Sequence, residues 1–282
     1  MTRRIIYYGG VPKYEPEVIR FLTAISVPNN STLYYPSTAY EIMGSEIWEA
    51  LNTCIEGVKT ALGLTLKSDN LSTKFKYIYP RIGGTSTAHR YNLVTGTADG
   101  TYNGGFTHDA TGSVGNGSTG YFDTGFQFSI SNFAQNSLSF GVYIKNAISE
   151  NTVDFGVFSG GVCDALMYSR GAAGNMLSRL GSNSGNIANA NTTSLGLKVL
   201  SRTASNQYKV YEDGSLLATN TDTSTLNNTT YNMLEFAGSS AGSPVQYSNH
   251  KHTWFWGGIG FGATEIGNIY TALNTFETTL NR

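Results

Sequence analysis

The sequence predicts a mainly β protein, an antiparallel β-sandwich or jelly roll with a short helical N-terminal region and a C-terminal helix. From about residue 75, short stretches of alternating apolar and polar residues recur between turns rich in Gly, Asn, Ser and Asp, which is the pattern of antiparallel sandwiches. The chain also holds 18 Tyr and 14 Phe, and aromatic side chains suit the half-buried surface of a sheet. Helical spacing of apolar residues is clear only towards the two ends of the chain.

Residues 1–74 are predicted to be a helical region for attachment or oligomerisation. Pro16 begins a short helical pattern, because proline is favoured in the first turn of a helix. A clearer helix is expected from Ser45, a good N-cap residue, to Gly63, a good terminator. Its apolar positions are three and four residues apart, as in a short coiled-coil seam, and they are Trp48, Leu51, Ile55, Val58 and Leu62.

Two interpretations of this seam remain open. A seam this short is marginal on its own, so the helix must pack on something. It packs either on the rest of its own chain or on the same helix of other copies around a symmetry axis.

Residues 75–282 are predicted to form the sandwich and the terminal helix. Asp213-Gly214 lies between two apolar runs and is a strong signal for a tight β-hairpin. The final helix is expected to begin at Thr264 as N-cap, with apolar residues at a helical period from Ile266 to Leu280. The predicted strands are 75–80, 120–128, 137–145, 153–158, 165–169, 195–202, 207–212, 215–220, 233–238 and 253–261.

Composition and charge argue against several partners. Charged residues make up 13% of the chain, against about 25% in typical soluble domains, so Gly, Ser, Thr and Asn must build much of the surface. The net charge of −1 provides no long-range attraction for nucleic acid or an anionic membrane. No stretch approaches the roughly 20 apolar residues that span a bilayer, and the start of the chain lacks the apolar stretch of a signal peptide. We therefore expect no nucleic-acid partner and no membrane insertion.

Several segments resemble known families. Residues 209–218 (KVYEDGSLLA) are similar to a hairpin of laminin-G-like, concanavalin A-like jelly rolls, and 234–238 (LEFAG) to the strand that follows it. Residues 255–262 (FWGGIGFG) and the helix after them extend this match. More specifically, structural proteins of tailed bacteriophages resemble the chain at 75–85, 88–93, 103–108 and 116–124.

The resemblance implies a structural component of a bacteriophage virion, such as a head or tail fibre or a decoration protein. Its lectin-like sandwich would be exposed for adhesion to host-surface glycans. Residues 1–74 would dock on other virion proteins or on other copies of the chain, as in a trimer. A virion protein is made in the host cytoplasm and released by lysis, so it needs no signal peptide. The alternative is a secreted bacterial carbohydrate-binding module.

No catalytic residue is predicted. A glycosidase needs two carboxylates on either side of the bond that it cleaves. Glu150 and Asp154 are the pair nearest to a suitable spacing, whereas Glu212 and Asp213 belong to a hairpin turn. The sequence therefore predicts a protein that is not an enzyme.

The candidate carbohydrate-binding residues are His250, His252, Trp254 and Trp256. Their alternate spacing would place all four on one face of a strand, where the tryptophans could stack on sugar rings. The competing interpretation is a core strand in which both tryptophans pack internally.

No cofactor and no metal are predicted. The two histidines could chelate an ion, but the sequence places no third ligand beside them. Calcium would suit the carboxylates of Asp99, Asp109 and Asp123, which lie in Gly-rich and Thr-rich loops. Their spacing is not distinctive, so calcium is unsupported.

Overall fold

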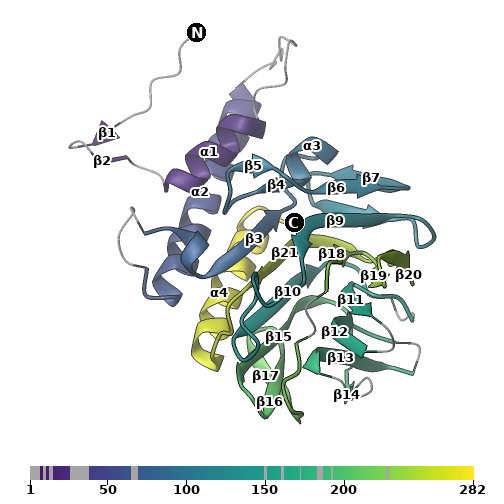
Figure 1. Cartoon of the computed structure of the whole chain (residues 1–282). Helices are drawn as coiled ribbons and strands as arrows, with labels where there is room; N and C mark the ends of the chain where they lie inside the picture. The colour runs from purple at the N-terminus through teal and green to yellow at the C-terminus, as the bar shows by residue number, and fades with distance from the viewer. Residues whose placement is uncertain are drawn as a thin grey trace.

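Two sheets lie face to face, and helices cover the outer side of one of them (Figure 1). The computed structural model describes residues 7–8, 11–12, 15–25, 38–64, 69–148, 151–159, 162–171, 173–182, 187–191, 193–226 and 229–282. The predicted fold class, a mainly β antiparallel sandwich with a terminal helix, is confirmed.

The sheet next to the helices has eight strands, with β21 near its centre. Strand β21 pairs with β10 on one side and with both β3 and β8 on the other. The sheet order is β17 (Ser215–Thr221), β16 (Gln207–Glu212), β15 (Gly196–Ala204), β10 (Leu138–Ile144), β21 (Lys251–Gly258), β8 (Gly112–Gly115) and β7 (Phe106–Asp109), with β3 (Phe75–Pro80) beside β21.

The second sheet has nine strands. Its order is β14 (Ile187–Ala190), β13 (Asn175–Ser182), β12 (Val162–Tyr168), β11 (Phe155–Ser159), β18 (Asn232–Glu235), β9 (Tyr121–Gln127) and β6 (Thr101–Asn103). Strand β19 (Gly238–Ser240) runs parallel to β11 and forms a hairpin with β20 (Ser243–Val245). Smaller elements are the pairs β1 (Tyr7–Tyr8) with β2 (Val11–Pro12) and β4 (Tyr91–Asn92) with β5 (Thr97–Ala98), the turn η1 (Leu71–Thr73) and helix α3 (Ser86–His89).

Strand β10 is buried on both faces, which suits its mostly apolar sequence. Phe140 and Val142 point between the sheets, where they join a core of aromatic and aliphatic side chains from both. Tyr143 points the other way, into a second core under the helices. Alternation therefore separates two apolar layers rather than an apolar face from a wet one.

The helices are α1 (Pro16–Ile25), α2 (Thr38–Ala61) and α4 (Ala263–Thr279). Helices α2 and α4 pack on each other, and both contribute to the core against the outer face of the eight-stranded sheet. Three seam residues of α2, Leu51, Ile55 and Val58, are buried in this core, and so is Leu62 directly after the helix. The seam therefore packs within its own chain instead of offering an exposed surface for oligomerisation, and the side chain of Trp48 lies outside the described residues.

Two predicted helix starts differ from the structure. Helix α2 begins at Thr38, so Ser45 lies in its interior and not at its N-cap. Helix α4 has Gly262 before its first residue, and the Glu265 carboxylate accepts a 2.7 Å hydrogen bond from the Gly262 N–H. The predicted hairpin is confirmed, because Asp213 and Gly214 join β16 to β17 and both have the positive φ that such a turn requires. In the described part of the chain, no helix combines the length and apolar character needed to cross a bilayer.

Gly141 of β10 tests the packing between this sheet and the helices. A Cβ at this position would lie 2.3 Å from the ring of Trp256, its cross-strand neighbour. We expect Gly141→Ala to destabilise the protein by about 1–3 kcal/mol, because the buried indole must shift. Gly267→Ala in α4 is the control, since its nearest neighbour would be at 3.7 Å and alanine favours a helix. Urea unfolding should show a loss for the first variant and none for the second; equal midpoints for Gly141→Ala and the parent chain would contradict this packing.

Candidate functional site

The structure buries the four residues predicted to contact sugar. His250, His252, Trp254 and Trp256 are all at most 2% exposed. The register of β21 against β10 shifts by one residue between His252 and Trp254, so a bulge turns these two side chains to opposite faces of the sheet. This differs from the expectation of one shared face, and none of the four is placed where a sugar could reach it.

The tryptophans are instead part of the core beneath the helices. Trp254 meets Phe276 of α4 edge-on, with the ring centroids 5.4 Å apart. Its indole Nε1 donates a 2.8 Å hydrogen bond to Glu277 Oε1. Both tryptophans therefore pack internally, as the competing interpretation of this strand predicted.

The histidines belong to a row of ionisable side chains between the sheets, which we call the buried charge row: Arg81, Glu235, His252, Asp154 and His250. Arg81 Nη2 pairs with Glu235 Oε2, and Glu235 Oε1 lies 3.0 Å from His252 Nδ1. His252 Nε2 lies 3.1 Å from Asp154 Oδ1, which is also 2.5 Å from His250 Nδ1. All five side chains have no exposed surface.

Both sheets contribute to this row. Arg81 follows β3, and His250 and His252 lie at the start of β21, in the eight-stranded sheet. Glu235 ends β18, and Asp154 directly precedes β11, in the nine-stranded sheet. The row therefore connects the two layers by charge, in the interior that apolar contacts otherwise fill.

Asp154 is held in its ionised form. Burial alone would raise the pKa of this carboxyl, but the charges and hydrogen bonds of His250 and His252 outweigh burial and bring its pKa well below the ordinary value. The Ser169 backbone N–H adds a 2.6 Å hydrogen bond to Oδ2. Removing either carboxylate would leave buried positive charge without a partner, which is strongly destabilising.

A second group of histidines extends from Arg81 towards the surface. His89 Nδ1 lies 2.8 Å from Ser113 Oγ and 3.2 Å from His108 Nδ1. The Gly84 N–H donates to His89 Nε2 at 3.2 Å, so that nitrogen carries no proton. Burial, followed by the charge of Arg81, lowers the pKa of His89 to about 2 and also lowers the pKa of His108. His89 is therefore a neutral core histidine.

The buried pair Asp154 and Glu235 does not have the arrangement that glycoside cleavage requires. Asp154 and Glu235 have His252 between them and are closed off from solvent, whereas a glycosidase must admit a sugar between its two acids. Glu150, the acid paired with Asp154 in the sequence analysis, lies outside the described residues.

The loop carboxylates considered for calcium are bound by protein groups. Asp109 forms a 2.7 Å ion pair with Lys251. Asp99 accepts hydrogen bonds from Tyr79, Asn92 and Thr95. Asp123 lies on β9, where it accepts hydrogen bonds from the Asn232 amide. Each of the three carboxylates thus already has protein donors.

A polar hollow on the outer surface of the nine-stranded sheet is the more accessible candidate. It has a volume of about 230 Å³ and is lined by Tyr121, Asp123, Thr230, Tyr231, Asn232, Leu234, Ser239, Gly242 and Pro244. We call it the β9–β18 hollow, because β9 and β18 both contribute lining residues, as does the β19–β20 hairpin.

The geometry of the β9–β18 hollow is fixed by neighbouring groups. Asp123 accepts hydrogen bonds of 3.0 and 3.2 Å from the Asn232 amide and one of 2.8 Å from the Gly125 N–H. Gly242, at φ +88°, lets the hairpin close on Tyr231, since a Cβ there would be 3.0 Å from the tyrosine ring. The hollow therefore holds two partly exposed phenol rings beside a carboxylate and an amide.

Sequence comparison identifies no relative: no family profile matches the chain, and no curated protein matches it. Solved structures do share its fold. A mutant of Trypanosoma rangeli sialidase displaying trans-sialidase activity matches with a TM-score of 0.51 and 13% identity, over 84% of this chain and 39% of the sialidase. T. rangeli sialidase in complex with sialic acid matches with a TM-score of 0.50 and 13% identity, over the same shares.

A further match is domain 4 of AbnA, an extracellular arabinanase from Geobacillus stearothermophilus, in complex with arabinotriose. Its TM-score is 0.45 at 14% identity, over 70% of this chain and 98% of that domain. The chain corresponds to less than half the length of either sialidase. At 13% identity the two sialidase matches show a similar fold and nothing further.

His89 provides a prediction for pH dependence. Below about pH 6.5 the unfolded chain binds a proton on this histidine, whereas the folded chain does not, so stability falls as the pH falls. A histidine held neutral contributes a slope approaching about 1.4 kcal/mol per pH unit. We expect His89→Gln to flatten the decline between pH 6.5 and 4.5, measured by urea unfolding at each pH.

His108→Gln is the matched control, because His108 is only partly buried and should change the slope less. Parallel pH curves for His89→Gln and the parent chain would contradict the assignment of His89 as neutral.

Proposed function

We propose that this protein is a non-catalytic, glycan-binding β-sandwich and that the β9–β18 hollow is its binding site. The observation that carries the proposal is the combination, in one accessible hollow, of two tyrosine rings with a carboxylate and an amide. A sugar presents a rim of hydroxyls, and a hollow with a mostly polar exposed lining suits such a rim.

Each lining group has a role in this proposal. The exposed lining of the hollow is mostly polar, so Tyr121 and Tyr231 would contribute chiefly their hydroxyls. The Asp123 carboxylate would accept hydrogen bonds, whereas the Asn232 amide both donates and accepts. The hollow is smaller than the roughly 300–1,000 Å³ of pockets that enclose drug-sized ligands, so it suits a terminal sugar unit rather than a long stretch of polysaccharide.

The fold supports the same kind of ligand. The T. rangeli sialidase structure of similar fold holds sialic acid. A hollow with a single carboxylate among its lining residues favours binding over the two-acid chemistry of glycoside hydrolysis, and we propose that the protein is not an enzyme.

We further propose that the sandwich is displayed on a bacteriophage particle, as part of a head or tail fibre or a decoration protein. The support is the sequence resemblance of 75–85, 88–93, 103–108 and 116–124 to virion structural proteins. Display in several copies, for example as a trimer, would combine weak single-site affinities through effective concentration. A secreted bacterial carbohydrate-binding module, by contrast, would act as a monomer.

Substitutions in the hollow test the binding site. We expect Tyr231→Ala and Asp123→Asn each to weaken glycan binding by tenfold or more, because one removes a hydroxyl and a wall of the hollow and the other replaces an acceptor oxygen by an amide nitrogen. A glycan array would identify a ligand for the intact protein, and calorimetry would then measure each variant. Tyr270→Ala, in the partly buried surface of α4, is the control and should bind as the parent does. A blank array, or full binding by both hollow variants, would contradict the proposed site.

A separate experiment tests the virion. We expect mass spectrometry of purified phage particles to detect the protein, and light scattering of the isolated chain to give a mass above 30.4 kDa, the mass of one copy. A monomer that is absent from particles would favour the secreted binding module.

A further inference from the structure

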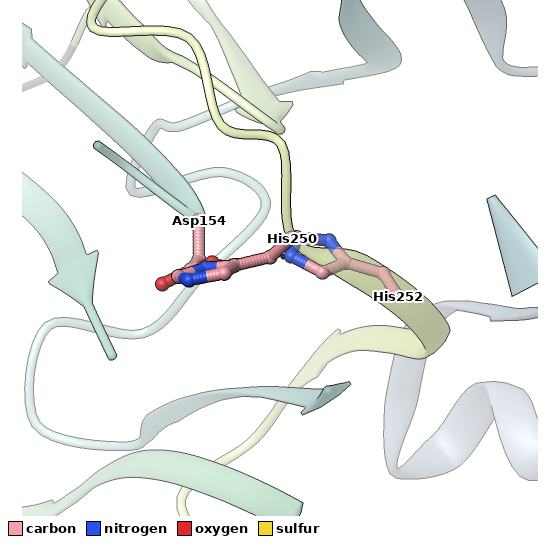
Figure 2. A group of neighbouring side chains, drawn as sticks. All are labelled: Asp154, His250 and His252. Carbon is pink, nitrogen blue, oxygen red and sulfur yellow. Dashed lines mark hydrogen bonds and ion pairs between the residues drawn. The ribbon is translucent and has the colours of Figure 1, made fainter. Parts of the chain in front are cut away.

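The core of the sandwich contains a set of ligand atoms suited to a metal ion. Asp154 Oδ1, His250 Nδ1 and His252 Nε2 all lie within 4.8 Å of one another and are fully buried. Figure 2 shows the three side chains converging. Asp154 comes from the residue before β11, and both histidines come from the start of β21. The local sequence places no third ligand beside the two histidines, and the fold provides one, Asp154.

The outer contacts of these side chains match those of metal ligands. A histidine that binds a metal through one nitrogen usually donates its other N–H to a carboxylate or a carbonyl. His252 directs its second nitrogen, Nδ1, at Glu235 Oε1, at 3.0 Å. His250 directs Nε2 at the Ile148 carbonyl oxygen, at 3.2 Å. Both rings are therefore oriented by acceptors on the side away from Asp154.

Counting hydrogen-bond donors supports the same conclusion. Carboxylates and carbonyls only accept, yet each of the two rings has such an acceptor near both nitrogens. A neutral imidazole carries one N–H. In each neutral ring, the other nitrogen would therefore point its own lone pair at an acceptor. A cation between Asp154 Oδ1 and these two nitrogens removes both conflicts, because the lone pairs then bind the ion and each remaining N–H keeps its acceptor.

The charge of the site also fits. Without a metal, each ring would need a second proton to donate to both of its acceptors. One divalent ion would replace these two protons, so the net charge of the buried charge row stays the same. Arg81 neutralises Glu235, and the Ser169 N–H binds the Asp154 oxygen that does not face the histidines. Each ligand therefore has its own outer support.

From this geometry we propose that Asp154, His250 and His252 form a site for a first-row divalent transition metal, of which Zn²⁺ is the best fit. Imidazole nitrogens favour zinc, copper, nickel and iron over calcium and magnesium. A tetrahedral zinc with bonds of about 2.1 Å separates its ligand atoms by about 3.4 Å. The 3.1 Å pair already approaches this value, and the 2.5 Å pair must open by roughly 1 Å.

The site would be structural. Its ligands have no exposed surface, and Asp154 belongs to one sheet while the histidines belong to the other. Two serine hydroxyls lie beside the ligand atoms: Ser169 Oγ is 3.5 Å from His250 Nδ1, and Ser248 Oγ is 3.5 Å from Asp154 Oδ1. The ion would cross-link the two sheets from inside.

Metal titration of the full chain tests the site. The protein is stripped with a chelator and titrated with Zn²⁺ by calorimetry, and with Co²⁺ by visible absorption. We expect one equivalent of each ion to bind, the absorption of cobalt in a four-coordinate site, and a higher melting temperature with zinc. Absence of stoichiometric binding by the folded, metal-free protein would overturn the proposal.

Variants locate the ion. Asp154→Asn should weaken zinc binding by at least about 100-fold, whereas Glu235→Gln, which alters only an outer contact, should weaken it by about 10–100-fold with one equivalent still bound. His108→Gln removes a histidine outside the site and should bind zinc as the parent does. Parent-like affinity in Asp154→Asn would overturn the proposal.

Nitrogen-15 NMR of the parent chain gives an answer even if a variant fails to fold. In the zinc-bound protein, His250 should keep its proton on Nε2 and His252 on Nδ1, so the two rings should show opposite tautomers. The same tautomer on both rings, or imidazole signals unchanged by zinc, would refute the site.

Discussion

The structure depends on satisfying charge inside an apolar sandwich. A buried ion is tolerated only when opposite charges and hydrogen bonds surround it, and here those partners come from different sheets. Arg81 follows the first strand of one layer, and its partner Glu235 ends a strand of the other. A shift of either sheet by one residue would leave a charge facing hydrocarbon. The buried charge row thus fixes how the two sheets align, which apolar contacts alone do not specify.

The sequence predicted correctly those elements whose structure depends mainly on residues close together in the chain. The Asp213-Gly214 hairpin, the apolar strand β10 and the apolar face of α4 follow from turn chemistry and periodicity. The strands β4 to β8 and β13 to β14 were not predicted, because they are short or contain polar and small residues that also suit loops. Long-range pairing stabilises them, and a single sequence does not report it.

The candidate sites were harder to predict for two physical reasons. One extra residue in β21 reverses the faces of His252 and Trp254, and nothing in the local pattern marks a bulge at this position. The partners of the histidines are also distant in sequence, since Asp154 precedes His250 by 96 residues. The β9–β18 hollow likewise combines two strands and a hairpin that only the fold brings together. His250-Lys-His252 was the one signal that pointed to the buried cluster.

The position of β21 affects how the protein can be made. This strand fills the gap between β10 and the pair β3 and β8, yet it begins only at Lys251 of a 282-residue chain. A nascent chain that still lacks it exposes strand edges on both sides of the gap, and unpaired edges promote association between chains. Folding of this layer is therefore expected to wait until residues 251–258 have been made, because they insert as its closing strand.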